Sequence, residues 1–352
     1  MEAIWSQRSK PISQSDPHYD EDLEGKTLQE CENIVNSLQR VDFRYVAEGR
    51  ANVVFSIWEL EGPAAPSKGR SKGRFEGTLL RVPKVTPDVT PCDYETLQRF
   101  HEGQVEGRVG RQHLVPQALI KISAEVADVL RSKRNRTDES DIRAGGAMLI
   151  QDMSVSPGYS VLEFKPKWLA QSPIAPPDAR RCRTCAREGF RNHQKQAQGQ
   201  PVSVPVCPLG LVHEDPVIVM DTIRRLAPEW TGADQRRLSD AFDRSGILKR
   251  LRELQTTGDP DRELLDNPSD PAFGLAMTLR DCSCYVRMPT DTTKDVEIKL
   301  ADVDKKNWEE KQTYWQESHQ NLIENGWYTC EERLDSPPIV TKCVLDQPPP
   351  TS

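Results

Sequence analysis

Three short apolar runs near the start of the chain constrain its fold more than any other feature. The first two fill residues 43–60, which are rich in Val, Phe, Trp and Ile and are interrupted only by a Glu-Gly-Arg turn at residues 48–50. The third, at residues 78–82, follows a segment rich in Gly, Pro, Ser and Lys at residues 62–77. Short β-branched and aromatic runs bounded by turn residues are typical of strands. The pattern predicts three antiparallel strands after a helix at residues 28–38.

Farther along the chain, helical and strand-like patterns follow one another. Apolar residues at i, i+3, i+7, i+10 and i+11 predict a helix over residues 119–130, with a loop at 131–143. Further predicted helices are 217–226, 238–254 and 308–324, and further predicted strands are 147–150, 161–164, 275–278, 285–288 and 296–303. We therefore expect an α+β chain with an antiparallel-sheet N-terminal lobe and a larger α+β C-terminal lobe.

The 352 residues are enough for two ordinary domains. We expect the lobes to span residues 26–152 and 153–335, with a disordered N-terminus at 1–25 and a tail at 336–352, because both ends are polar and contain prolines. No apolar run approaches the roughly 20 residues that cross a bilayer, and the start lacks the apolar stretch of a secretory signal. We therefore expect a soluble intracellular chain without a membrane span.

Charge is spread unevenly. The formal net charge is −7, which argues against stable binding of nucleic acid, yet residues 165–195 hold eight Lys and Arg against two acidic residues. Guanidinium and ammonium groups form charge-assisted hydrogen bonds with phosphate oxygens, so this basic segment could receive several phosphates. Trp168 and several prolines stiffen it, unlike a floppy basic tail. The alternative interpretation is a solvated charged surface.

The cysteines do not form the framework of a secreted scaffold. They number nine, an odd count in a chain without a signal peptide, so most are expected to be reduced. Cys182 and Cys185 have the C-x-x-C spacing of zinc ligands, with His193, Cys207 and His213 as conceivable further ligands. A possible structural Zn²⁺ here would hold the basic segment; the alternative is a pair of reduced surface thiols.

Two features of the first strands could contact a nucleotide. A Gly turn lets backbone N–H groups approach a phosphate closely, although an ordinary hairpin turn at residues 48–52 has the same composition. Arg81 lies on the predicted third strand, where a cation can reach nucleotide phosphates; the alternative is a solvated strand charge. Each signal is weak alone.

Asp281 and Asp302 lie beside predicted strands of the C-terminal lobe. A pair of carboxylates suits Mg·ATP chemistry, because one can accept a hydroxyl proton while the other holds Mg²⁺. Either residue alone is more often a turn residue. The chain contains no H-R-D-x-x-x-x-N and no D-F-G motif, which argues against a protein kinase of the usual kind.

Seven motifs, taken in order, resemble the inositol-pentakisphosphate 2-kinase family and its fungal members in particular. They span about residues 48–328 and read EGRANVVF, LLRVPK, AMLIQDMS, LEFKPKW with RRCRTCA, CPLGL, LRDCS, and LADVDKK followed by NGWY. The resemblance implies a two-lobed kinase-like fold with a nucleotide-binding N-terminal lobe and a C-terminal lobe for substrate and catalysis. It also implies ATP-dependent phosphorylation of the 2-hydroxyl of inositol 1,3,4,5,6-pentakisphosphate, which gives inositol hexakisphosphate (phytate).

The resemblance further implies roles for individual residues. Asp281 would be the general base and Asp302 the Mg²⁺ ligand. The residues implied to bind ATP are Gly49, Arg50, Ala51, Asn52, Arg81, Gln151, Asp152 and Glu163. Those implied to bind the substrate are Lys165, Lys167, Arg181, Arg187, Lys306 and Tyr314. One departure concerns Cys185, which stands where the family often has a histidine, so that Arg183 or Arg187 would have to substitute for it.

Two other functions remain open on the residues themselves. One is a non-catalytic scaffold that binds a polyanion such as a phosphoinositide or RNA, and the other is an inositol polyphosphate kinase of different regiospecificity. Residues 131–136 (RSKRNR) could be a short nuclear-import patch or an exposed loop. The family suggests nuclear residence, with a cytoplasmic pool also expected. We expect a monomer whose lobes close over the substrate.

Overall fold

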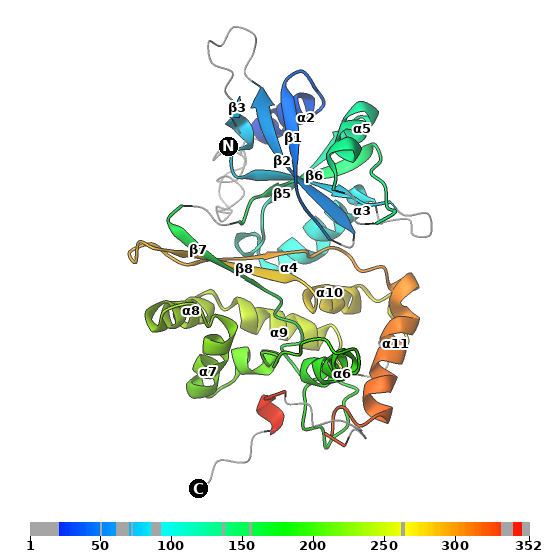
Figure 1. Ribbon diagram of the computed structural model, residues 1–352, viewed down its shortest axis with the longest axis vertical. Coiled ribbons are helices and arrows are strands. Elements are labelled where there is room, and N and C mark those ends of the chain that lie inside the picture. Colours follow the sequence, from blue (N-terminus) through cyan, green and yellow to red (C-terminus); the bar gives the residue numbers. More distant parts are fainter. Residues whose placement is uncertain are drawn as a thin grey trace. The chain divides into compact units, whose positions relative to one another are not determined.

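The computed structural model divides the chain into two compact units, Met1–Ser154 and Val155–Ser352 (Figure 1). The residues that it describes are 21–49, 51–60, 70–71, 73–85, 93–135, 138–154, 157–261, 265–331 and 341–346. Among them, no helix combines the length and the apolar composition that crossing a membrane requires. The predicted α+β class is confirmed, with a sheet in each unit.

The first unit is built on an antiparallel sheet. Its strands, in spatial order, are β1 (Val41–Glu48), β2 (Asn52–Leu60), β4 (Thr78–Pro83), β6 (Gly145–Gln151) and β5 (Gln117–Ile122), and the short β3 (Arg70–Ser71) pairs with β2. The three strands predicted at the start of the chain are therefore confirmed as β1, β2 and β4.

Two helices cover one face of this sheet, and a third lies on the other. Alternate β2 residues such as Phe55 point into a core that also receives side chains from α2 (Glu21–Val35) and α5 (Ala124–Lys133). On the opposite face, α3 (Tyr94–Phe100) packs against Met148 of β6. The connection from α3 to β5 contains the short helices η2 (His101–Glu106), α4 (Gly107–Val109) and η3 (Arg111–His113).

The helix predicted at 119–130 is wrong over its first part. Residues Gln117–Ile122 form strand β5, and the helix begins only after Ser123, whose hydroxyl accepts a hydrogen bond from the Val126 backbone N–H at 3.3 Å. The apolar residues of β5 fit strand alternation as well as helical spacing, and the N-cap decides where the helix starts. The helix then runs to Lys133, into the predicted loop.

The second unit has a three-stranded antiparallel sheet of β7 (Tyr159–Phe164), β8 (Ser283–Pro289) and β9 (Glu297–Ala301), with β8 in the middle. Its helices are α6 (Arg183–Ala197), α7 (Pro216–Leu226), α8 (Gly232–Ser245), α9 (Ile247–Thr257), α10 (Pro271–Leu279) and α11 (Trp308–Glu324), with short 3₁₀ turns η4 (Pro208–Val212) and η6 (Val344–Asp346). Strands β7, β8 and β9 and helices α7 and α11 confirm the sequence prediction.

Two predictions for this unit are wrong. The single helix predicted at 238–254 is two helices, because Gly246 adopts a left-handed φ of 63° and separates α8 from α9. The strand predicted at 275–278 belongs to α10, which Asp270 caps by accepting a hydrogen bond from the Ala272 backbone N–H at 2.7 Å. A short apolar run cannot be told from a buried helical segment by periodicity alone. Helix α6 was not predicted.

Ordered structure extends into both predicted terminal segments. Helix α2 begins at Glu21, within the segment 1–25. Within the segment 336–352, the described residues 341–346 include Thr341 and Cys343, which are both buried.

Candidate active site

Sheet pairing brings together residues that lie more than 100 positions apart in the sequence. The last residue of β7 pairs with the second residue of β8, and the last residue of β9 pairs with the first. The segments that leave β7 and β9 therefore meet the segment that enters β8 at one end of the sheet. Lys165 directly follows β7, Asp281 precedes β8 by two residues, and Asp302 directly follows β9.

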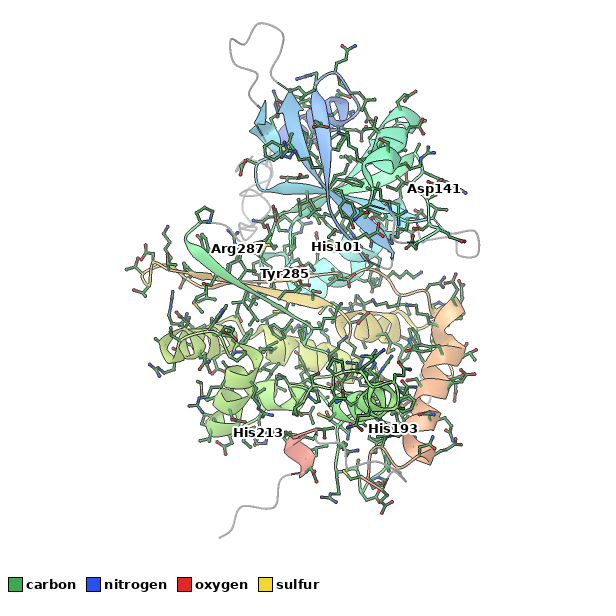
Figure 2. The ribbon with its side chains drawn as sticks, in the orientation of Figure 1. His101, Asp141, His193, His213, Tyr285 and Arg287 are labelled. Atoms are coloured by element: carbon green, nitrogen blue, oxygen red, sulfur yellow. The ribbon has the colours of Figure 1, made fainter. Side chains whose placement is uncertain are left out.

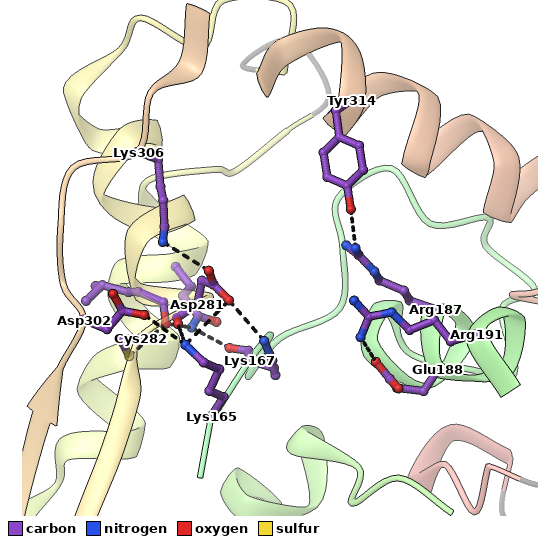
Figure 3. Close-up of polar contacts among 12 residues, drawn as sticks. Lys165, Lys167, Arg187, Glu188, Arg191, Asp281, Cys282, Asp302, Lys306 and Tyr314 are labelled. Atoms are coloured by element: carbon purple, nitrogen blue, oxygen red, sulfur yellow. Dashed lines mark hydrogen bonds and ion pairs between the residues drawn. The ribbon is translucent and has the colours of Figure 1, made fainter. Parts of the chain in front are cut away.

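At this sheet end, three ammonium groups surround two carboxylates (Figure 3). The Lys165 Nζ lies 3.1 Å from Asp302 Oδ2 and donates to the Asp281 main-chain carbonyl at 2.5 Å. Lys167 Nζ and Lys306 Nζ each lie 3.1 Å from an oxygen of the Asp281 carboxylate. These five residues form what we call the Asp281 cluster. The Asp281 and Asp302 side chains are 49% and 44% exposed, so a bound ligand can reach both.

The charges of the cluster determine the ionisation of Asp281. Partial burial of the carboxyl group tends to raise its pKa, but the ammonium groups of Lys306, Lys167 and Lys165 outweigh burial and lower the pKa from 3.8 to about 2. The carboxylate is therefore ionised at every pH above about 4. It is able to accept a proton, although the three cations make it a weak base in the free protein.

Two members of the cluster have a strained backbone. Lys167 and Asp302 both have φ of 57°, in the left-handed region that costs a non-glycine residue about 1–2 kcal/mol. The buried Gln255 holds the first of these segments, because its Nε2 donates to the Lys167 carbonyl at 2.9 Å and its Oε1 accepts from the Leu169 N–H at 2.9 Å. Strain that the surrounding structure maintains is a common property of functional sites.

Buried side chains support Asp281 from the interior. Arg280 Nη1 pairs with Asp259 at 2.5 Å, and its guanidinium lies 3.6 Å from the centre of the Trp168 ring. Arg280 Nη2 also donates to the Gln255 carbonyl at 3.2 Å. Sequence analysis did not predict the supporting roles of Asp259 and Gln255, since neither lies in a recognisable motif. The only sequence signal for this support was the position of Arg280 next to Asp281.

We expect Gln255→Leu to destabilise the second unit. Leu leaves the half-buried Lys167 carbonyl and the buried Leu169 N–H without their partner, which costs about 2–4 kcal/mol in the free energy of unfolding. The expected fall in Tm is about 5–15 °C by differential scanning calorimetry. The control is Gln320→Leu on the exposed face of α11, where Gln320 pairs only with Glu324 among the described contacts. Equal Tm values for the two variants would contradict the positioning role of Gln255.

The remaining residues predicted to bind substrate lie in two different settings. Arg187 on α6 donates to the Tyr314 hydroxyl on α11, and Tyr314 is half-exposed (Figure 3). By contrast, Arg181 is buried, and its Nη1 donates to the Trp327 carbonyl at 3.3 Å. Arg183 is buried as well, with its guanidinium 5.4 Å from the centre of the Trp168 ring. Substrate contacts by Arg181 and Arg187 stay predictions.

In the first unit, the predicted Gly turn joins β1 to β2. The Gly49 N–H donates to the Asn52 carbonyl at 2.9 Å, and the Lys84 N–H donates to the Ala51 carbonyl at 2.8 Å. The turn is thus attached to the chain that leaves β4. Arg50 lies outside the described residues.

Arg81 lies next to this turn. Strand alternation sends its neighbours on β4, Leu80 and Val82, into the core, so Arg81 points to the opposite face. There the Asn52 amide lies 2.6 Å from Tyr94 Oη and 2.7 Å from Arg81 Nη2, and an amide oxygen facing the guanidinium satisfies both groups. The structure therefore brings two of the predicted nucleotide contacts, Asn52 and Arg81, together.

The other predicted ATP contacts lie farther along the chain. Gln151 ends β6, and its Oε1 is buried without a hydrogen-bond partner among the described residues. The Asp152 N–H donates to the Gly77 carbonyl at 2.8 Å. Glu163 is exposed on β7 and belongs to the second unit. Their roles in binding ATP stay predictions.

The predicted cysteine pair belongs to a larger cluster, which we call the four-cysteine cluster. Four buried Sγ atoms lie within 4.8 Å of one another, and they belong to Cys182, Cys185, Cys207 and Cys343. Sequence analysis offered His193 on α6 and His213 after η4 as further ligands (both labelled in Figure 2). Neither histidine is a member of the cluster. Sequence analysis missed Cys343, because it lies 136 residues beyond Cys207 and outside any motif.

Fold and site together define a class of protein. An α+β chain with a Gly turn and an arginine in one antiparallel sheet, and with ammonium groups around two carboxylates at the end of another, is typical of a phosphotransferase of the kinase type. A family model described as inositol-pentakisphosphate 2-kinase matches residues 45–321. A protein of the same name from Yarrowia lipolytica (strain CLIB 122 / E 150) is 30% identical over 292 residues, which cover 80% of this chain and 90% of that protein. The chain belongs to the inositol-pentakisphosphate 2-kinase family.

Proposed function

We propose that this protein transfers the γ-phosphate of ATP to the 2-hydroxyl of inositol 1,3,4,5,6-pentakisphosphate and so produces inositol hexakisphosphate. The observation that carries the proposal is the Asp281 cluster, in which three ammonium groups and two carboxylates meet at one sheet end. A substrate with five phosphates needs several cations, and transfer to its hydroxyl needs one proton acceptor.

In this proposal, separate residues of the cluster perform these tasks. Lys165, Lys167 and Lys306 bind substrate phosphates, and Asp281 accepts the proton of the attacking hydroxyl. When phosphates take up the ammonium groups, less positive charge acts on Asp281, so its pKa rises from about 2. Substrate binding therefore makes the base stronger at the moment when it is needed.

The donor set at the sheet end also fits Mg²⁺. Carboxylate oxygens are the ligands that this ion prefers, and the Asp302 side chain is 44% exposed. We assign Asp302 as the residue that holds Mg²⁺, which neutralises charge on the transferred phosphate. Lys165, which pairs with Asp302 in the free protein, is a proposed substrate ligand. When the Lys165 ammonium pairs with a substrate phosphate instead, the Asp302 carboxylate becomes available to the metal.

For ATP, the proposal uses the residues that the family resemblance implies. The Gly turn and Arg81 contact the phosphates. The buried Oε1 of Gln151, which has no hydrogen-bond partner among the described residues, supports an adenine contact through Gln151 and Asp152. Glu163 contacts the ribose. The full set is Gly49, Arg50, Ala51, Asn52, Arg81, Gln151, Asp152 and Glu163.

The test is incubation with Mg·ATP and a panel of inositol phosphates, with the products resolved by isomer. We expect conversion of the pentakisphosphate with a free 2-hydroxyl into the hexakisphosphate. Phosphorylation at a different hydroxyl would indicate another regiospecificity. Binding of the panel without consumption of ATP would indicate a non-catalytic scaffold that recognises polyanions.

The ionisation of Asp281 predicts the pH dependence of kcat/KM for the pentakisphosphate. A pKa held at about 2 means that the ion pairs of Asp281 favour the folded protein above about pH 4 and are lost as pH falls through about 2. If kcat/KM decreases between pH 8 and pH 5, we expect protonation of the substrate phosphates to be the cause, because their second pKa is about 6. Lys306→Met removes a cation beside Asp281 and so raises its pKa, but it should leave the midpoint of this decrease at the same pH. A shift of the midpoint to higher pH would show that Asp281, and not the substrate, titrates between pH 8 and pH 5.

We also propose a monomer that resides in the nucleus, with a cytoplasmic pool, as the family suggests. The family resemblance carries the nuclear proposal. Within the basic stretch at 131–136, Arg134 is buried and its Nε pairs with Glu48 at 2.6 Å, and residue 136 lies outside the described residues. Imaging of the chain fused to a fluorescent protein tests the nuclear proposal, and exclusively cytoplasmic signal would refute it. Light scattering of the purified chain tests the monomer, and a doubled mass would refute it.

A further inference from the structure

We propose that a buried ion-pair network centred on Lys84 positions the Gly turn at residues 48–52, so that its backbone N–H groups can receive the phosphates of the nucleotide. The members of this Lys84 network are Lys84, Glu48, Arg134 and Asp138. The inference rests on the proposed function, in which the Gly turn contacts ATP. Lys84 is a positioning residue, because it acts on the turn and not on the nucleotide.

Lys84 is attached to the Gly turn on both sides of Gly49. Its backbone N–H donates to the carbonyl of Ala51, which precedes β2, at 2.8 Å. Its Nζ lies 3.3 Å from Oε1 of Glu48, which ends β1. The Lys84 and Glu48 side chains are only 3% and 5% exposed, so water competes little for this pair. A residue that holds both ends of the turn restricts the backbone conformations that the turn can adopt.

A second cation and a second carboxylate complete the network. Arg134, the C-cap of α5, is almost fully buried; its Nε pairs with Glu48 Oε2 at 2.6 Å and its Nη2 with Asp138 Oδ1 at 2.7 Å. Lys84 Nζ pairs with Asp138 Oδ2 at 2.6 Å. Each carboxylate therefore contacts both cations, and the two positive charges balance the two negative ones. This balance keeps the charged groups paired in the interior.

Backbone contacts hold the segment that carries Asp138. Asp141 and Val85 exchange backbone hydrogen bonds at 2.9 and 2.7 Å. Arg134 Nη1 donates to the Ser140 carbonyl at 2.6 Å, and the Ser140 N–H donates to Asp138 Oδ1 at 3.0 Å. The Lys84 network therefore connects the Gly turn to the end of α5 and to the chain that leaves β4.

Two features indicate that the network positions the turn and does not bind phosphate itself. The Lys84 ammonium contacts two carboxylates and is almost fully buried, so it is not available to a nucleotide. A buried ion pair also stabilises a fold no more than well-packed apolar side chains do, because both ions lose their water. What the ions add is direction, since charge-assisted hydrogen bonds fix the geometry between segments. A turn that binds phosphate through backbone N–H groups needs such a fixed conformation.

The experiment measures binding of ATP and of adenosine to the full chain by calorimetric titration, without an inositol phosphate. Glu48→Gln keeps the size of the side chain and removes the charge that holds Lys84 and Arg134. We expect the Kd for ATP to rise at least about tenfold, which is the factor that a hydrogen bond to a charged group contributes. The Kd for adenosine, which has no phosphate, should change by less than about twofold. A purely structural role would lower Tm without changing the ratio of the two Kd values.

Glu30→Gln is the matched control, since Glu30 pairs with Arg74 at 2.5 Å on the exposed surface of the same unit, and it should leave both Kd values unchanged. Should Glu48→Gln fail to fold, Asp138→Asn replaces it, because Asp138 is half-exposed and the variant should still raise the Kd for ATP at least about threefold. A wild-type ratio of the two Kd values in the folded variant would overturn this proposal alone. A wild-type chain that does not bind ATP would overturn the proposed function, and this inference with it.

Discussion

Asp281→Asn is expected to reduce kcat by about 10²-fold or more, which is the scale that a general base contributes. The amide occupies the same space but cannot accept the hydroxyl proton. It also removes a negative charge that pairs with Lys167 and Lys306, so these cations become more available to phosphates. We therefore expect the Kd for the pentakisphosphate to stay the same or fall while kcat collapses.

This divergence of kcat and Kd separates a catalytic role from damage to the fold. Single-turnover kinetics and calorimetric titration measure the two quantities, and Asp295→Asn serves as a control of the same chemistry at an exposed position. Wild-type turnover in folded Asp281→Asn would reject the assignment of the base. A parallel loss of binding and turnover would indicate instead that the carboxylate mainly organises the lysines.

The double variant Lys165→Ala, Lys167→Ala is expected to raise KM for the pentakisphosphate by about 10²-fold or more, because a hydrogen bond to a charged group contributes about 1.5–3 kcal/mol. The KM for ATP should change by less than about threefold, since the residues proposed to bind the nucleotide differ from these two. Steady-state kinetics with each substrate varied in turn provides the comparison.

A second double variant corrects for the loss of two positive charges. Lys249→Ala, Lys294→Ala changes the net charge equally, at exposed residues of the same unit. It should leave both KM values close to those of the wild type. Equal increases in KM for the pentakisphosphate and for ATP in the Lys165, Lys167 variant would place the substrate pocket elsewhere.

The secondary structure was predicted well where the apolar pattern fitted only a helix or only a strand. Helix α11 and strands β7, β8 and β9 lie where periodicity indicated. The errors lie where a pattern fitted two structures and a local interaction decided between them. Ser123 caps α5 and starts it late, Gly246 divides a long amphipathic pattern into two helices, and Asp270 caps a helix that contains an apolar run. Such choices depend on hydrogen bonds and φ angles that apolar spacing does not encode.

The candidate site shows a different limit. Resemblance to a family picked out all five residues of the Asp281 cluster, and the structure brings them into contact. What could not be predicted was the support beneath them. Gln255 acts through hydrogen bonds to Lys167 and Leu169, and Asp259 through an ion pair with Arg280. Cys343 joins its partners from 136 residues away. Contacts of this kind arise from tertiary packing and leave no local pattern in the sequence.

The self-pairing of the Asp281 cluster also affects ligand selectivity. In the free protein, the carboxylates of Asp281 and Asp302 pair with the three lysines. An incoming anion must therefore compete with these carboxylates for the ammonium groups. A singly phosphorylated metabolite or inorganic phosphate forms ion pairs with one or two lysines and must break as many lysine–carboxylate pairs. A ligand that reaches all three lysines at once, with phosphates spread around a ring, makes all three exchanges for a single loss of translational freedom. Under the proposed function, we therefore expect the cluster to favour highly phosphorylated ligands over lightly phosphorylated ones without a steric barrier.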